Sequence, residues 1–281
     1  MNLLFFDKPM TTHALQNLSI AFVGGGNMAT AIIGGLVAVN ASDDLKLNLL
    51  VIDPNTDKEA YFTEQGVKFT TPDNMACIAE YDVVVLAVKP QVITDIAPTL
   101  APYVGNALVI SILAGVPVER LSALLGVERI VRCMPNLPAS VGQGATGLFA
   151  NLPQTDKDKA DAVMASVGVT VWVGDENLLH AVTAVAGSAP AYFFYALEAM
   201  IEEAVVMGLS PADAHKLAVQ SMIGAGQLAK RGDPATLRSQ VTSKGGTTAA
   251  ALAVLDDKQV DTAFKLAMVA CVKRSQELAQ S

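Results

Sequence analysis

Short apolar runs alternate with turns that contain glycine, proline or asparagine from the first part of the chain to Gly174. The clearest runs are rich in Val, Ile and Leu: Ser19–Val23, Leu47–Ile52, Asp82–Val88 and Ala107–Ile112. Continuous apolar runs are typical of strands buried on both faces of a parallel sheet. Weaker runs that would extend the sheet are Arg129–Cys133, Ala145–Ala150 and Val169–Val173. The pattern therefore predicts a doubly wound α/β domain with a mostly parallel sheet.

After Gly174 the pattern becomes helical, and residues 175–281 contain no convincing strand. Ser210-Pro211 and Asp233-Pro234 each offer an N-cap followed by a proline at the first helical position. The chain opens on an apolar stretch that stops at Asp7, too soon for the core of a signal peptide. We therefore expect a poorly ordered leader over 1–17, an α/β domain over 18–174 and an all-helical domain over 175–281. A packed N-terminal contact is the alternative for the leader.

The predicted helix Ala191–Met207 is apolar around most of its circumference, and its polar surface consists mainly of Glu198, Glu202 and Glu203. A helix of this kind needs more burial than so small a domain can provide alone. Dimerisation through the helical domain is the simplest remedy, so we expect a homodimer.

The net charge of −8 argues against a nucleic-acid partner, because binding to phosphates needs a cationic face. Hydrophobic residues make up 52% of the chain, but no unbroken apolar run reaches the ~18 residues of a membrane helix. The three cysteines lie far apart without a CxxC motif, and the three histidines are equally scattered. We therefore expect buried free thiols in a cytoplasmic protein with no metal site, no His-based triad and no membrane partner.

The strand Ser19–Val23 leads into Gly24-Gly25-Gly26-Asn27-Met28-Ala29 and then into an apolar helix. In this G-x-G-x-x-A pattern Gly24 permits the tight turn, Gly26 lets the backbone approach a pyrophosphate, and Ala29 allows close helix–strand packing. The helix start would present free N–H groups to the phosphates. Strand, glycine turn and helix together predict a dinucleotide-binding Rossmann domain. The alternative is a glycine turn that binds nothing.

Two charged residues follow later strands. Asp53 ends the second strand, where an acidic residue hydrogen-bonds the ribose 2′-hydroxyl of NAD. Its charge would repel the 2′-phosphate of NADP, and no Arg or Lys follows before Lys58. Capping of the turn Asp53-Pro54-Asn55 is the alternative role. Lys89 follows the next long strand at the edge that lines the ligand crevice, which favours cofactor contact over a simple surface position.

A second polar segment lies in the helical domain, just before the Ala-rich helix from Ala249. Its small residues are Ser243, Gly245, Gly246, Thr247 and Thr248. At a helix start these residues expose several backbone N–H donors and hydroxyls to one point, which predicts a cradle for a carboxylate or phosphate. An ordinary N-cap is the alternative, but it needs only one of these residues.

With these residues in hand, the chain from Ser19 onward resembles the pyrroline-5-carboxylate reductases. The matching segments are Gly24–Ala29 with Ala31-Ile32, Leu86–Gln91, Met134–Gly147, Gly187–Phe194 and Val241–Thr248. The resemblance implies a Rossmann domain, an interlocked helical dimerisation domain and often a ring of dimers. It also implies reduction of Δ1-pyrroline-5-carboxylate to L-proline, usually with NADPH. A protonated imine is already electrophilic, which suits a pocket of amides and hydroxyls without histidine.

The resemblance also implies site residues. The dinucleotide would contact Val23, Gly24, Gly25, Gly26, Asn27, Met28, Asp53, Asn55, Asn74, Ala87, Val88, Lys89, Pro90, Ala114 and Gln240. The substrate would contact Glu176 and the cradle, with Thr248 at the ring nitrogen as the catalytic residue. Because of Asp53, we expect NADPH with NADH also accepted.

Four departures from the family pattern are Ala189 for glycine, Leu137 for threonine, His180 for aspartate and Lys244 for proline. Lys244 adds a positive charge beside the proposed cradle.

The rival enzymes are a related imine reductase and a β-hydroxyacid dehydrogenase. A β-hydroxyacid dehydrogenase would carry a catalytic lysine in the first long interdomain helix, and Ala181–Met207 has none. A non-catalytic NAD(P)-binding regulatory dimer is the rival from another class, and it would not need the intact cradle.

Overall fold

The computed structural model describes residues 12–280, which form two compact units. The first, called the sheet unit here, runs to Gly187 and includes the chain from Val272 onward. The second, the helical unit, is Ser188–Cys271. The compact units divide at Gly187, later in the chain than the change of sequence pattern at Gly174. The reason is that the helical turns after Gly174 pack onto the sheet unit, where Asn136 Nδ2 donates to the carbonyl oxygen of Ala186 at 3.0 Å.

The sheet unit is built on one sheet with the strand order β3-β2-β1-β4-β5-β6-β7-β8. The strands are β1 (Ser19–Val23), β2 (Asn48–Ile52), β3 (Lys68–Thr70), β4 (Val83–Leu86), β5 (Leu108–Ser111), β6 (Ile130–Met134), β7 (Gly144–Phe149) and β8 (Gly168–Trp172). Strands β1 to β6 are parallel, β7 is antiparallel to β6, and β8 is parallel to β7. The doubly wound, mostly parallel fold is confirmed. The strand order reverses at β1, so the ligand crevice of this fold lies outside the carboxyl ends of β1 and β4.

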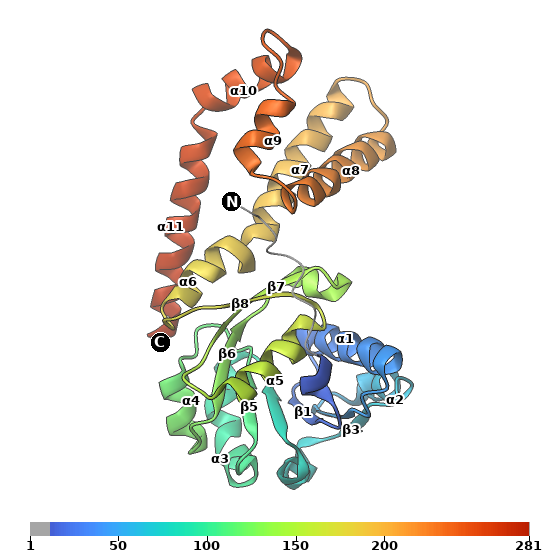
Figure 1. Ribbon diagram of the computed structural model, residues 1–281, viewed down its shortest axis with the longest axis vertical. Coiled ribbons are helices and arrows are strands. Elements are labelled where there is room, and N and C mark those ends of the chain that lie inside the picture. Colours follow the sequence, from blue (N-terminus) through green and yellow to red (C-terminus); the bar gives the residue numbers. More distant parts are fainter. Residues whose placement is uncertain (1–11, 281) are drawn as a thin grey trace. The chain divides into compact units, whose positions relative to one another are not determined.

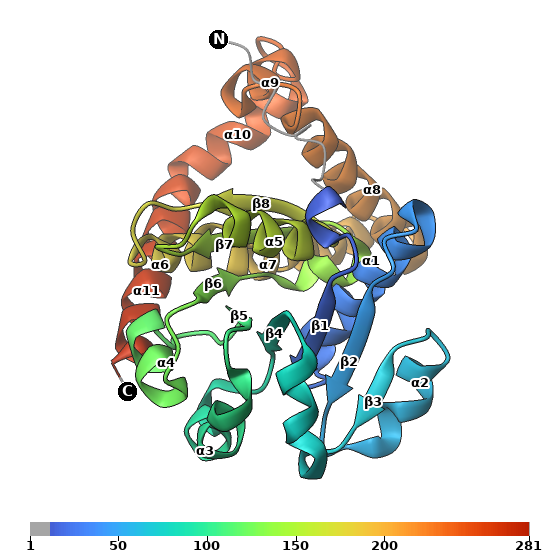
Figure 2. The same cartoon turned by 60° about the horizontal axis from the view of Figure 1, so that its bottom comes forward.

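Helices cover both faces of the sheet (Figures 1 and 2). They are η1 (Thr12–Leu15), α1 (Asn27–Asp43), η2 (Thr56–Lys58), α2 (Glu59–Thr63), η3 (Pro72–Glu80), η4 (Pro90–Val92), α3 (Ile93–Val104), α4 (Val118–Leu125), η5 (Leu137–Val141), α5 (Gln154–Ala165), α6 (Leu178–Val182) and the π-helix η6 (Thr183–Gly187). Successive strand residues enter opposite cores. Phe22 packs with α1, α2 and α5, whereas Val23 packs with η3, α3 and α4. This two-sided burial explains why the strands are apolar without alternation.

Two expectations for the sheet unit were wrong. Strand β3 was missed because it has three residues at the sheet edge and its first residue, Lys68, is exposed. The expected poor order fails for residues 12–17, because they include the helix η1, and Leu15 in it is fully buried in the core beside α1. The rest of the expected leader, residues 1–11, lies outside the described residues.

The helical unit contains α7 (Ala189–Val206), α8 (Pro211–Ala229), α9 (Pro234–Gln240), α10 (Thr247–Asp257) and most of α11 (Val260–Ala279). Both predicted N-caps are confirmed. Ser210 Oγ accepts from the N–H of Asp213 at 3.1 Å, and Asp233 Oδ2 accepts from the N–H of Thr236 at 2.8 Å. The hydrogen bonds from Thr236 hold the pKa of Asp233 below its usual value.

One helical run, Leu178–Val206, is long and apolar enough by length and composition to cross a membrane. Polar residues such as His180 and Ser188 interrupt its apolar stretches, so the sequence shows no unbroken apolar run of that length. Only 11% of the relevant window is buried, so this run is mostly exposed in the single chain.

Candidate active site

The turn after β1 can be made only by glycine. Gly24 has φ +103°, and a Cβ atom there would lie 2.7 Å from the carbonyl oxygen of Ala87. Neither backbone can move aside freely, because the N–H of Gly24 bonds to Ile52 at 2.8 Å and that of Ala87 bonds to Val23 at 2.9 Å. The glycine turn is therefore fixed by the two neighbouring strands on which it sits.

The next part of the turn fits a pyrophosphate. Gly26 is exposed, and a Cβ atom there would meet a single atom at 3.9 Å, so the space beside it is open. It is the N-cap of α1 and no side chain caps the helix start, which leaves backbone N–H groups of the first turn for a ligand. A helix of this length adds a positive end to the same place. The predicted residues Gly24–Met28 thus form the kind of cradle that holds dinucleotide phosphates.

Asp53 makes two hydrogen bonds to the backbone, one of which is the turn-capping role considered for it. Its Oδ2 accepts from the N–H of Gly25 at 2.6 Å, which ties the end of β2 to the glycine turn. Its Oδ1 accepts from the N–H of Asn55 at 2.8 Å, which is the turn-capping role. Asp53 remains half-buried at the place where a ribose lies in this fold.

Most other residues predicted to contact the cofactor also follow strands of the sheet unit. Val23 ends β1, Ala87–Pro90 follow β4, Ala114 follows β5, and Asn74 lies in η3. Since these strands are parallel, the residues that follow them emerge at one edge of the sheet. Lys89 and Ala114 are exposed there, as a ligand contact requires. Gln240 is the exception, because it ends α9 in the helical unit.

The predicted cradle of the helical unit is a tight turn into α10. Gly245 has φ +75°, and the N–H of Gly246 bonds to the carbonyl oxygen of Ser243 at 3.0 Å. A Cβ atom on Gly246 would lie 2.4 Å from Ser243 Oγ, so a side chain there would displace the Ser243 hydroxyl from the turn. Gly246 is the N-cap of α10 and no side chain caps this helix start. Thr247 is exposed and Thr248 half-exposed, so hydroxyls and free N–H groups are available together.

Glu176 has a structural role that the sequence did not reveal. Its Oε1 accepts from Arg132 Nη1 at 2.7 Å and from the N–H of Val118 at 2.9 Å, joining β6 to the start of α4. His180 lies close by, where burial and then Arg132 lower its pKa while Glu176 acts in the opposite direction. A charged residue within the apolar strand β6 was the available signal for a buried ion pair. The substrate contact of Glu176 remains a prediction.

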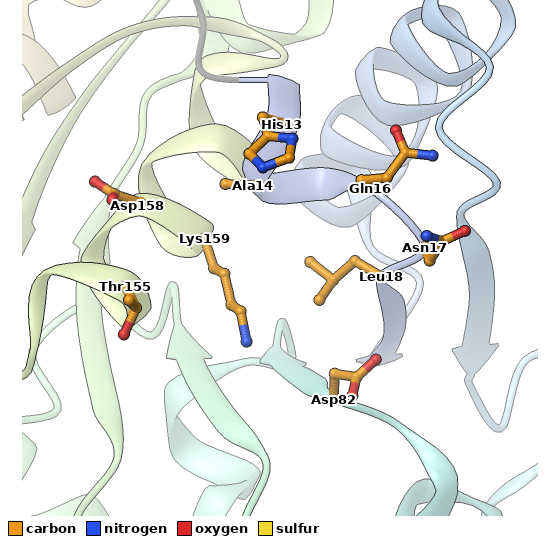
Figure 3. A pocket seen from close by; sticks show the side chains of 9 residues that line it. All are labelled: His13, Ala14, Gln16, Asn17, Leu18, Asp82, Thr155, Asp158 and Lys159. Atoms are coloured by element: carbon orange, nitrogen blue, oxygen red, sulfur yellow. The ribbon is translucent and has the colours of Figure 1, made fainter.

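A hollow of about 480 Å³ lies elsewhere on the sheet unit (Figure 3). Lys159 of α5 and Asp82 line it, and Asp82 precedes β4 as Leu18 precedes β1. Burial opposes the charge of Asp82, but hydrogen bonds from Ser19 outweigh it and lower the pKa of this carboxyl. The hollow is therefore at the amino ends of the strands, the edge opposite Gly24, and is separate from the dinucleotide cradle.

The three cysteines are free, and Cys133 is buried as expected. Burial raises the pKa of the Cys133 thiol, which keeps it protonated and unreactive. Cys77 and Cys271 are partly exposed, so the expectation of buried thiols holds for only one of the three.

Comparisons with known proteins cover both units. The profile of a family described as pyrroline-5-carboxylate reductase dimerisation matches residues 176–278. A family described as NADP oxidoreductase, coenzyme F420-dependent, matches residues 19–115.

The chain is similar over its length to individual reductases. It is 45% identical over 271 residues to the pyrroline-5-carboxylate reductase of Haemophilus influenzae, covering 94% of this chain and 98% of that protein. Its structure is similar to that of the Coxiella burnetii enzyme, with a TM-score of 0.87, 38% identity and coverage of 95% and 100%. The Plasmodium falciparum enzyme with NADP bound has a TM-score of 0.81, 27% identity and coverage of 94% and 99%.

Proposed function

The chain belongs to the pyrroline-5-carboxylate reductase family, and we propose that it reduces Δ1-pyrroline-5-carboxylate to L-proline with a nicotinamide dinucleotide. The observation that carries the proposal is the presence of two uncapped helix starts behind glycine turns. One follows Gly24–Gly26 in the sheet unit and fits a pyrophosphate. The other follows Gly245–Gly246 in the helical unit and fits a carboxylate.

The reduction of a protonated imine needs little acid–base catalysis from the protein. When bound, the reduced nicotinamide supplies the hydride that saturates the C=N bond of the protonated imine. The start of α10 and the turn Ser243–Gly246 would bind the substrate carboxylate through backbone N–H groups. The Thr248 hydroxyl would hydrogen-bond the ring nitrogen and orient the imine. Positioning and charge complementarity then supply most of the rate enhancement.

Spectrophotometry tests the proposed reaction. We expect oxidation of NADPH with Δ1-pyrroline-5-carboxylate and at least tenfold slower oxidation with a cyclic imine that lacks the carboxylate, since one charge-assisted hydrogen bond is worth about 1.5 kcal/mol or more. Equal rates with both imines would favour a general imine reductase. Activity confined to 2-hydroxy or 3-hydroxy acids would favour a β-hydroxyacid dehydrogenase, and no turnover at all would favour a regulatory dinucleotide-binding dimer.

Thr248→Ala should lower kcat by roughly a few-fold to tenfold, because one lost hydroxyl contact is worth ~0.5–1.5 kcal/mol. Dinucleotide affinity, measured by fluorescence titration, should change little because Thr248 belongs to the cradle of the helical unit. Thr248→Ser keeps the hydroxyl and is the matched control. If the alanine and serine variants turn over alike, Thr248 does not act on the imine through its hydroxyl.

For the cofactor, we propose an enzyme that uses NADPH and accepts NADH unusually well. Repulsion between the Asp53 carboxylate and a nearby 2′-phosphate weakens the binding free energy of NADPH by on the order of 1–4 kcal/mol. The low end of this range applies because Asp53 is half-exposed. The two backbone N–H groups that point at its oxygens offset part of the field of this negative charge.

Asp53→Ser should therefore shift the ratio of kcat/KM values toward NADPH by roughly tenfold or less, since ~1.4 kcal/mol is one decade. Both kcat/KM values should also fall, because the Gly25 N–H loses a short hydrogen bond. Steady-state kinetics with each cofactor measures the shift. An unchanged ratio would leave Asp53 with its turn-capping role alone.

We also propose that the chain acts as a dimer in the cytoplasm and that its dimers assemble into a ring. The match of residues 176–278 to a dimerisation family supports self-association. The three free cysteines suit a reducing compartment.

A further inference from the structure

The turn between β2 and α2 folds back onto the glycine turn through a series of hydrogen bonds. Asp53 Oδ1 accepts from the N–H of Asn55 at 2.8 Å, and Asn55 Oδ1 accepts from the N–H of Asp57 at 3.0 Å. The second bond caps the short helix η2, which ends at Lys58. The side chain of Lys58 then reaches back and donates from Nζ to the carbonyl oxygen of Gly25 at 2.8 Å.

The Gly25 peptide is consequently held on both sides. Its N–H points to Asp53 at 2.6 Å and its carbonyl oxygen receives Lys58. Both charged groups thus stand where the end of β2 meets the glycine turn. In dinucleotide-binding folds this is the place of the adenosine ribose, whose 2′ position distinguishes NADP from NAD.

Lys58 has unused binding capacity. An ammonium group has three N–H donors, and Gly25 takes one of them. Lys58 is half-exposed, and none of the ion pairs among the described residues involves it. Asp53 already accepts one backbone N–H at each of its two carboxylate oxygens. The nearby acidic side chains, Asp57 and Glu59, are exposed and water can screen them.

We propose that Lys58 binds the 2′-phosphate of NADPH and is the residue that makes this cofactor acceptable despite Asp53. The inference rests on the proposed function in one respect, namely that the dinucleotide binds at Gly24–Gly26. Lys58 keeps its bond to Gly25 and offers its two remaining donors to the phosphate. Asp53 is a positioning residue that fixes the glycine turn, and the uncharged ribose hydroxyls of NADH can still bind beside it.

Direct binding measurements separate this proposal from the catalytic one. The probes are NADP⁺ and NAD⁺, together with the fragments adenosine 2′,5′-bisphosphate and AMP, each titrated against the full chain by calorimetry without substrate. Lys58→Met should weaken NADP⁺ relative to NAD⁺ by about 10- to 100-fold, the worth of charge-assisted hydrogen bonds to a phosphate. The fragment pair should show the same change in ratio.

Two control variants define the comparison. Lys58→Arg keeps a cation and should retain the preference to within a few-fold. Lys68→Met removes an exposed lysine at the start of β3, which is in register with Leu50 in the middle of β2 rather than with the glycine turn, and should leave the ratio unchanged.

Each result decides the matter. A ratio that falls with Lys58→Met and is preserved with Lys58→Arg supports the proposal, whether or not the enzyme reduces Δ1-pyrroline-5-carboxylate. Equal weakening of NADP⁺ and NAD⁺ would mean that Lys58 only supports the Gly25 carbonyl, and the proposal would fall. Unchanged binding of both nucleotides would also overturn it, since the phosphate would then lie elsewhere.

Discussion

Gly24→Ala is expected to lower dinucleotide affinity by roughly 100-fold or more and to remove measurable activity at ordinary cofactor concentrations. The left-handed φ of +103° costs an alanine on the order of 1–3 kcal/mol. The added Cβ would also lie 2.7 Å from the Ala87 carbonyl oxygen, which the sheet holds in place. Displacing the turn by even part of an ångström takes the start of α1 away from the pyrophosphate, so the two effects add.

The measurement is titration with NADP⁺, accompanied by circular dichroism to show that the sheet unit remains folded. Gly34→Ala is a matched control on the same helix, because a Cβ atom at Gly34 meets nothing within 4 Å. That variant should bind normally and gain up to ~1 kcal/mol of stability, since alanine is the better helix former. Wild-type affinity in Gly24→Ala would show that the turn is not the phosphate cradle.

Much of the sheet unit could be predicted because its signals are local. Strand β1 was predicted to the residue, since Ser19–Val23 is an apolar run that starts at a serine and ends at the glycine turn. The other predicted strands were placed to within a few residues at their ends. A strand buried on both faces is continuously apolar wherever it occurs, so no knowledge of its neighbours is needed.

The features that could not be predicted depend on residues far apart in the sequence. Nothing near Glu176 indicates that Arg132 will reach it, and nothing near Leu15 indicates that it enters the core beside α1. The sequence likewise left the role of Asp53 undecided, because its hydrogen bond to Gly25 joins the end of β2 to the glycine turn after β1. The glycine turns before α1 and α10 could be predicted from the sequence. A positive φ, or a group that lies close to the backbone, restricts a single position to glycine.

The helical unit carries an apolar surface that the single chain leaves uncovered. A groove of about 430 Å³ runs between α7 and α11 and is lined almost entirely by apolar atoms. The residues that line it are Ala191, Tyr192, Tyr195, Ala196, Ala199, Val260, Ala263, Phe264 and Ala267. Tyr195 is 78% exposed, and other large apolar residues on α7, such as Val206 at 78%, are equally uncovered. Because this surface lies within the region matched to a dimerisation family, we expect a second copy of the chain to cover it.

Tyr195→Asp should therefore weaken the dimer by about a thousandfold or more. Two-fold symmetry places the substitution in the interface twice, and burying each unpaired carboxylate costs at least ~2 kcal/mol, which together amounts to about three decades in Kd. The fold of one chain should tolerate the change, since this side chain is mostly exposed there. The melting temperature should nevertheless fall and should no longer depend on protein concentration, because dimerisation no longer stabilises the folded chain.

Sedimentation velocity at micromolar concentration measures the effect. The unaltered chain should sediment as a dimer or larger assembly, and the variant as a species near the chain mass of 29.3 kDa. Tyr61→Asp makes the same substitution at an exposed tyrosine of the sheet unit and should leave the assembly intact. If Tyr195→Asp assembles as the unaltered chain does, the groove between α7 and α11 is not part of the interface. If the unaltered chain is itself a monomer, the apolar circumference of α7 needs a different partner.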